Sequence, residues 1–160
     1  RAGARPGDDL WVSGSPGRAA PALAHLRPDV PLAPADRDDC LAALHRPQPR
    51  VELGLALRGL ASAMLDVSDG LLGDLDHSLE QSGVGAQIEE ATAGGDDYEL
   101  LFTAPLEHRT EIGALAARLA LPLHRIGAIT GPEHGLQLHE RDGRLRLLSA
   151  SGYDHFGGRP

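Results

Sequence analysis

The sequence predicts an α+β fold, with a mixed or antiparallel sheet and helices packed on it. Stretches typical of strands alternate with stretches typical of helices, a pattern that a doubly wound parallel sheet would also give. Near its end, however, the chain has two short strand-like stretches around Asp142-Gly143, a strong signal for a β-hairpin. Short spacings between elements also favour α+β. The 160 residues suffice for one domain with a core, or for part of a larger protein.

The spacing of apolar residues and the positions of glycine and proline divide the chain into elements. The stretch Asp96–Thr103 is apolar on both alternating faces, which predicts an interior strand. Glycine after Ser82 predicts the end of a helix. We predict helices at 19–26, 34–44, 51–60, 70–82 and 105–120, and strands at 8–13, 63–65, 85–88, 96–103, 123–129, 136–139 and 144–148.

The composition argues against several kinds of partner and site. The net charge is −8, whereas binding of a nucleic acid would require a basic surface. Only 3% of residues are aromatic, so few side chains could stack on nucleic-acid bases. The chain has no lysine, which excludes a phosphate loop of the Walker type. Cys40 is expected to be a small buried or half-buried thiol, and His77 a solvated helix residue. With no membrane-spanning run or signal peptide, we expect a cytoplasmic protein without membrane partners.

The stretch from Ala63 to Leu72 carries the strongest local signal for chemistry. An apolar strand ends in a corner with Asp66, Ser68 and Asp69, and a helix follows. Free N–H groups at a helix start attract anions, and two carboxylates around a turn can converge on Mg²⁺. The same residues also suit ordinary capping, with Ser68 or Asp66 as N-cap and Asp69 in the first turn. Locally, the pattern favours the capping interpretation.

Five motifs together point to a family. They are Arg1–Asp8, Trp11–Gly17, Leu65–Leu71, Gly94–Thr103 and Gly152–Phe156. Each motif is weak alone, but they follow one another in the order found in thiamine-monophosphate kinases, and the chain resembles that family essentially from end to end. The resemblance places the chain in the superfamily of aminoimidazole ribonucleotide synthetase.

The resemblance implies that residues 1–160 are a single C-terminal domain that binds ATP and substrate. An N-terminal domain, absent from this sequence, would form a homodimer and supply further metal-binding aspartates. The implied reaction is direct, in-line transfer of a phosphoryl group from ATP to thiamine monophosphate, with Mg²⁺ and with no residue acting as a catalyst of its own. By position the implied site residues are Asp66 and Asp69 for the metal, Arg1 and Ser68 for ATP, and Asp96 and Tyr153 for the thiamine substrate.

Those roles suit the residue types. Phosphoryl transfer depends on positioning and charge neutralisation, which carboxylate-bound metal ions provide. An arginine such as Arg1 can clamp phosphate oxygens, and a tyrosine such as Tyr153 can lie against a substrate ring.

Two features depart from the family pattern. Asp96 stands where the family usually has glutamate, one methylene longer. Only Glu89–Ala93 connects the strand near Ile88 to Gly94, whereas the family has a longer segment there, so we expect residues to be missing from this connection.

Two alternatives to the kinase remain. One is another ATP-using member of the superfamily, such as selenophosphate synthetase or a hydrogenase maturation factor. The Gly-Gly-Asp-Asp-Tyr-Glu-Leu and Gly-Tyr-Asp-His-Phe motifs argue against it. The other is a non-catalytic fragment that binds phosphate or Mg²⁺ without turnover.

Overall fold

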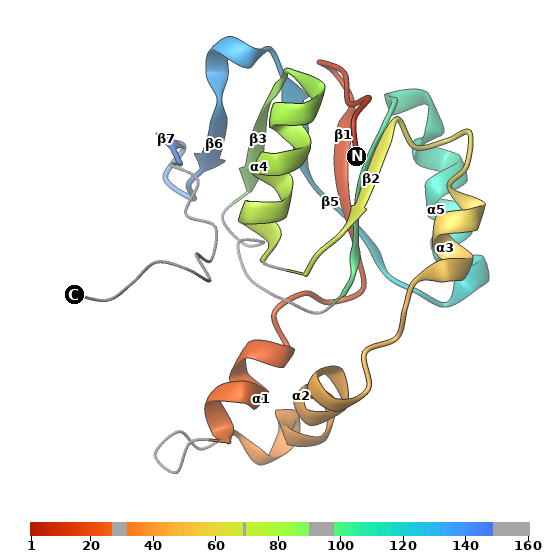
Figure 1. The fold of residues 1–160 in the computed structure, drawn as a ribbon, viewed down its shortest axis with the longest axis vertical. Helices are drawn as coiled ribbons and strands as arrows, with labels where there is room; N and C mark the ends of the chain where they lie inside the picture. The colour runs from red at the N-terminus through yellow and green to blue at the C-terminus, as the bar shows by residue number, and fades with distance from the viewer. Residues whose placement is uncertain (27–31, 69, 90–97, 149–160) are drawn as a thin grey trace.

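The computed structural model describes residues 1–26, 32–68, 70–89 and 98–148 (Figure 1). Within them, seven strands form one sheet in the order β2-β4-β1-β5-β3-β6-β7. Neighbouring strands are antiparallel except β3 and β6, which are parallel. The predicted α+β class is therefore confirmed. The strands are β1 (Asp9–Ser13), β2 (Ala63–Asp66), β3 (Gly85–Glu89), β4 (Leu100–Ala104), β5 (Leu123–Thr130), β6 (Leu136–His139) and β7 (Leu145–Leu147).

The α-helices follow the predicted pattern with two differences, and a short 3₁₀ turn at Pro132–His134 was not predicted. The helix predicted over 51–60 ends at Ala56, and Gly59 adopts a left-handed φ of 84° soon after. The helix predicted over 105–120 begins as a separate 3₁₀ turn, and the α-helix starts only at Arg109. The helical elements are α1 (Ala19–His25), α2 (Pro34–His45), α3 (Val51–Ala56), α4 (Leu71–Ser82), η2 (Leu106–His108), α5 (Arg109–Leu119) and η3 (Pro132–His134).

The sheet is covered on both faces, so its central strands are apolar on both sides (Figure 1). In β4, Leu101 points into the core that includes Leu71, Leu75 and Leu79 of α4. The next residue, Phe102, points into a second core with residues of α3 and α5. Alternation of side chains along a strand thus explains the two apolar faces that the sequence indicated for this stretch.

The helices α1 and α2 pack against each other at one end of the sheet instead of on its faces (Figure 1). The loop after β1 leads into this helical pair, and the segment from Arg46 to Arg50 leads out of it to α3. Cys40 in α2 is buried, as expected. None of the helices in the described parts of the chain has the length and apolarity needed to cross a membrane.

Candidate functional site

The polar corner predicted from the sequence lies where β2 ends and α4 begins. Val67 is fully buried in the core and fixes the chain between its two polar neighbours. The carboxylate side chain of Asp66 is 53% exposed, and one of its oxygens lies 4.0 Å from the guanidinium of Arg1. Ser68 follows Val67 and is half-buried. The fold therefore places Arg1 beside the corner that carries Asp66 and Ser68.

Arg1 reaches the corner because the first residues of the chain are bonded to α4. Ser78 donates a hydrogen bond from its hydroxyl to the carbonyl of Arg1, at 3.1 Å. The backbone N–H groups of Gly3 and Ala4 donate to the hydroxyl of Ser82, at 3.2 and 3.3 Å. Two serines, one helical turn apart, thus hold a segment that is distant in sequence.

The expectation that Ser68 or Asp66 caps the helix is wrong. The N-cap of α4 is Gly70, with φ of 104°, and no side chain bonds to the helix start as a cap. Instead, the N–H of Ser68 donates to the carboxylate of Asp74 at 2.8 Å. Asp74 lies in the first turn of α4, and only 6% of it is exposed. The corner is thus held by a hydrogen bond to a residue of α4, and Asp66 does not cap the helix.

The remaining predicted site residues cannot be placed beside this corner. Asp69, Asp96 and Tyr153 lie outside the described residues, as does the short connection after Glu89. Among the residues that the structure describes, no group of three or more His, Cys, Asp or Glu side chains could hold a metal ion. Asp66 therefore offers one accessible carboxylate, which suits an ion that is completed by phosphate oxygens and water.

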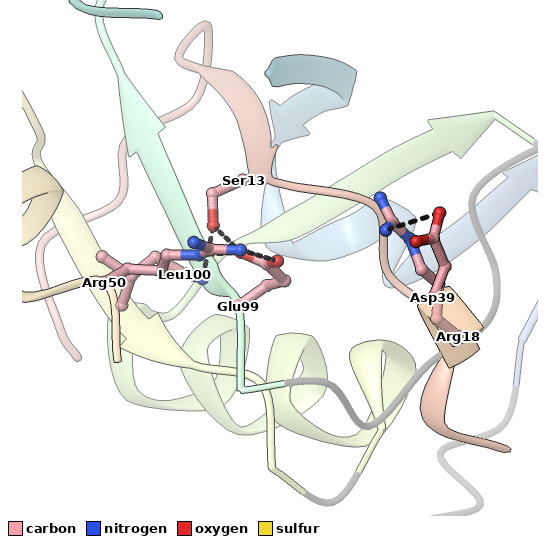
Figure 2. Close-up of polar contacts among 6 residues, drawn as sticks. All are labelled: Ser13, Arg18, Asp39, Arg50, Glu99 and Leu100. Carbon is pink, nitrogen blue, oxygen red and sulfur yellow. Dashed lines mark hydrogen bonds and ion pairs between the residues drawn. The ribbon is translucent and has the colours of Figure 1, made fainter. Parts of the chain in front are cut away.

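Figure 2 shows a buried network that sequence reasoning missed. It is close to the corner, because the N–H of Val67 donates to the carbonyl of Glu99 at 2.8 Å. Glu99, directly before β4, is only 4% exposed. Arg50 binds its carboxylate through two hydrogen bonds, at 2.6 and 2.8 Å, and the hydroxyl of Ser13 donates to it at 2.5 Å. The hydroxyl of Ser13 also accepts the N–H of Leu100 at 2.9 Å. The hydrogen bond from Arg50 to Glu99 raises the pKa of that guanidinium, so it stays charged wherever the protein is folded.

Gly14 makes room for this network. A Cβ at Gly14 would lie 1.9 Å from a carboxylate oxygen of Glu99, and its φ of 64° is also left-handed. The sequence did contain a signal: Glu99 is an acid within a stretch interpreted as an interior strand, and a buried acid requires a partner. The sequence could not indicate that the partner would be Arg50, which follows a proline-containing break 49 residues earlier.

Two pockets meet at Tyr98, the residue before Glu99. The first, of about 520 Å³, has mostly apolar walls, and we call it the apolar pocket. The second, of about 430 Å³, contains Ser68 and residues of α1. The apolar pocket is lined by Pro47, Pro49, Arg50, Val51, Gly54, Met64, Asp66, Tyr98 and Leu100. Tyr98 therefore stands between the pocket of Asp66 and the pocket of Ser68.

A third pocket, of about 230 Å³, lies where the α1–α2 pair meets the Glu99 network. Arg18 and Asp39, whose charged groups lie 4.0 Å apart, line it together with Arg50 and Glu99. Figure 2 shows both ion pairs. Two of its three arginines are thus paired with carboxylates, and the third, Arg46, is exposed.

A comparison with known protein families identifies the class of protein that this fold and site represent. Residues 5–139 match the family described as AIR synthase related protein, C-terminal domain. The match covers most of the chain, and the chain belongs to this family.

The relatives are more specific. The thiamine-monophosphate kinase of Escherichia coli (strain K12) is 38% identical over 178 residues, which cover 98% of this chain and 54% of the relative. The chain thus spans about half the length of the curated relatives it matches. Because 178 positions exceed the 160 residues of this chain, the relative has residues inside the matched region that this chain lacks. The resemblance to this kinase family is confirmed.

Solved structures agree. The thiamine-monophosphate kinase of Stenotrophomonas maltophilia K279a is 39% identical, with a TM-score of 0.75 over 91% of this chain and 53% of that chain. AaThiL complexed with AMPPCP and TMP is 27% identical, with a TM-score of 0.76 over 97% of this chain and 53% of that chain. The hydrogenase maturation protein HypE of E. coli has a TM-score of 0.70 at 19% identity over 96% of this chain and 52% of that chain, which shows a shared fold alone.

Proposed function

We propose that this chain is the C-terminal part of an ATP-dependent kinase that phosphorylates thiamine monophosphate to thiamine diphosphate. The observation that carries the proposal is the 38% identity with a thiamine-monophosphate kinase over 98% of the chain. The likeness to AaThiL, whose solved complex holds AMPPCP and TMP, supports it. The fold alone would not, since HypE shares it.

Asp66 and Asp69 would hold Mg²⁺. The donor chemistry fits, because Mg²⁺ binds hard oxygen ligands, keeps several waters and commonly uses only one or two protein carboxylates. The exposed carboxylate of Asp66 meets this requirement from the described side of the corner. When bound, the ion would neutralise phosphate charge during transfer.

The protein's own groups would position the two substrates for in-line transfer. Arg1 would bind phosphate oxygens of ATP, because a guanidinium offers two parallel donors to such groups. Its ion pair with Asp66 is long, at 4.0 Å, and both side chains are more than half exposed, so a phosphate can replace it at little cost. Ser68 would contact ATP, and Asp96 and Tyr153 would contact the thiamine substrate. We assign no general acid, base or nucleophile.

The chain would supply one of two domains. We propose that residues 1–160 bind ATP and substrate, and that an N-terminal domain forms a homodimer and adds metal-binding aspartates. About half of each relative lies outside the match, which leaves room for such a domain. The enzyme would act in the cytoplasm, with thiamine monophosphate and ATP as its partners and without nucleic acid or membrane.

The test is ATP-dependent formation of thiamine diphosphate, measured by chromatography, for the full-length protein and for residues 1–160 alone. We expect product from the full-length protein and none from the isolated segment. If the full-length protein hydrolyses ATP with another acceptor and makes no thiamine diphosphate, a different superfamily activity is correct. If it binds Mg²⁺ and phosphate but turns over no acceptor, the chain belongs to a non-catalytic binding protein.

A further inference from the structure

Three polar side chains follow one side of α4. Asp74, Ser78 and Ser82 occur at every fourth residue, which places them one above the other on the helix. Asp74 and Ser78 are only 6% and 4% exposed, and their neighbours on this face are leucines of the apolar core. A polar group on a buried face is costly unless it is hydrogen-bonded. We call Asp74, Ser78 and Ser82 the polar stripe.

The partners of the polar stripe are the two chain segments that form the candidate site. Asp74 accepts the N–H of Ser68 at 2.8 Å, in the corner after β2. Ser78 donates to the carbonyl of Arg1 at 3.1 Å, and Ser82 accepts two further N–H groups of the same segment. One side of one helix therefore holds two segments that lie far apart in the sequence.

The side chain of Arg1 makes only a weak contact of its own. Its guanidinium lies 4.0 Å from Asp66, and both side chains are more than half exposed. An exposed ion pair of this length does little to fix either side chain, because water and salt screen it. Within the part of the chain that the structure describes, the bond from Ser78 is the hydrogen bond that holds the backbone of Arg1.

We propose that the polar stripe positions Arg1 and Ser68 relative to each other, so that both contact the phosphates of one ATP molecule. This inference rests on the proposed function, which assigns Arg1 and Ser68 to ATP. It adds Asp74 and Ser78 as positioning residues that act through those two. Residues four apart on a helix are separated by about 6 Å along its axis, so a rigid helix sets the spacing of the two segments. Groups that are held in place before binding give higher affinity than groups that the ligand must order.

The first variant is Ser78→Ala in the full-length protein, which removes the bond to Arg1 and leaves the guanidinium. We expect KM for ATP to rise about three- to tenfold, because Arg1 must then be ordered when ATP binds. KM for thiamine monophosphate should stay within about twofold of the wild type. Titration calorimetry with AMPPCP, a non-transferable analogue of ATP, should show the same loss of affinity.

Ser62→Ala is the matched control. The hydroxyl of Ser62 also takes part in hydrogen bonds, with Asp8 and Thr103, but it lies at the end of β2 opposite to Asp66. Both serine variants should lower the melting temperature slightly, and only Ser78→Ala should change KM for ATP. If Ser62→Ala raises KM for ATP equally, general loosening of the fold explains the effect and the inference is wrong.

A double-mutant cycle measures whether Ser78 acts through Arg1. Arg1→Gln removes the guanidinium, and in this background Ser78→Ala should change KM for ATP by less than about twofold. If Ser78→Ala raises KM for ATP by the same factor with and without the guanidinium, Ser78 does not position Arg1.

Two substitutions test the other end of the polar stripe. Asp74→Ala removes the acceptor for the N–H of Ser68 and should raise KM for ATP, as Ser78→Ala does. Asp74→Asn keeps an oxygen that can accept this N–H and should restore most of the affinity. Equal losses in the two variants would mean that the charge of Asp74 matters and not its hydrogen bond, which would overturn its positioning role.

The outcomes distinguish this inference from the proposed function. If the wild type makes no thiamine diphosphate, the proposed function fails, while weaker binding of AMPPCP to Ser78→Ala still supports the polar stripe. If the wild type makes thiamine diphosphate but Ser78→Ala leaves KM for ATP and AMPPCP binding unchanged, the inference fails alone. A wild type that binds no AMPPCP would overturn both.

Discussion

At the scale of single residues, the site depends on one buried side chain between two polar ones. Val67 is fully buried, so its neighbours Asp66 and Ser68 are directed away from the core on either side of it. The backbone of Val67 is paired with Tyr98 and Glu99. Chemistry at this corner is therefore separable from stability: the apolar residue holds the fold, and the polar residues are available to ligands.

If Asp66 holds the metal as proposed, Asp66→Asn should lower kcat of the full-length protein by about 100-fold or more, because it would remove a charge that stabilises the transition state. The melting temperature should change little, since this side chain is 53% exposed and its contact with Arg1 is long. Steady-state kinetics and thermal denaturation would measure the two effects. Asp142→Asn, in the exposed turn after β6, is the control and should alter neither. Unfolding of Asp66→Asn with normal turnover of the folded fraction would refute the metal role.

For the Glu99 network we predict the opposite of Asp66: substitutions there should change mainly the stability of the protein. Arg50→Met roughly keeps the volume of the side chain but leaves the carboxylate of Glu99, which is 6% exposed, without its charged partner. Removing one partner of a buried pair typically costs about 3 to 5 kcal/mol. Glu99→Gln should cost less, because Arg50 is 23% exposed and water can solvate it. Urea denaturation gives both free energies of unfolding, and an equal loss in the two variants would contradict this assignment of burial.

At the scale of elements, glycines set how closely the strands approach. Gly127 in β5 pairs with Leu10 of β1 and with Ile88 of β3. A Cβ there would lie 2.0 Å from the backbone carbonyl of Gln87, whereas a Cβ at Gly113 in α5 would meet nothing within 4 Å. The two glycines therefore differ in whether a side chain can fit at their position, although nothing in the sequence distinguishes them.

Gly127→Ala should lower the free energy of unfolding by about 1 to 3 kcal/mol, because β3 and β5 must separate to admit the methyl group. Gly113→Ala should raise it by about 1 kcal/mol, since alanine is the better helix former. Chemical denaturation of the two variants side by side measures both. If Gly113→Ala also lowers the free energy of unfolding, α5 has contacts near Gly113 beyond those in the described structure.

The sequence predicted most elements because local rules determine them. The stripe of Leu71, Leu75 and Leu79 predicted α4, and Asp142-Gly143 predicted the β6–β7 hairpin, which the structure contains. Long-range choices were beyond such rules. The parallel pairing of β3 with β6 has no local signature. The bond from the N–H of Ser68 to Asp74 displaced the expected cap because a carboxylate one turn inside the helix reaches the same corner.

The site was predictable only in part, for the same reason. Motifs close in sequence, such as Asp66 and Ser68, could be recognised together. The approach of Arg1 depends on serines of α4 far along the chain, and nothing in the pattern indicated it. The network of Ser13, Arg50 and Glu99 likewise brings together three stretches that are separate in the sequence. The structure places Arg1, Asp66 and Ser68 near one another, but the binding roles of all six predicted site residues stay predictions.

At the scale of the whole molecule, removing divalent metal should stop turnover without unfolding the protein. The core consists of two apolar clusters on the faces of the sheet, and no described acidic cluster needs an ion to neutralise it. Adding EDTA to the full-length enzyme should therefore abolish formation of thiamine diphosphate, and Mg²⁺ in excess should restore it. Circular dichroism should be unchanged throughout. Turnover that persists after complete chelation would exclude a metal-dependent transfer.

The position of β1 also affects how the chain reaches its structure. Of the strands in the described sheet, β1 is synthesised before the others, yet it lies inside the sheet, and Leu10 pairs with Thr103 on one side and with Gly127 on the other. During translation both edges of β1 stay without partners until the second half of the chain has left the ribosome. Contacts between such distant segments make folding slow and leave apolar strands open to association. We therefore expect the nascent chain to depend on chaperones until β5 is complete, and a chain truncated before Leu100 to be unable to form the centre of its sheet.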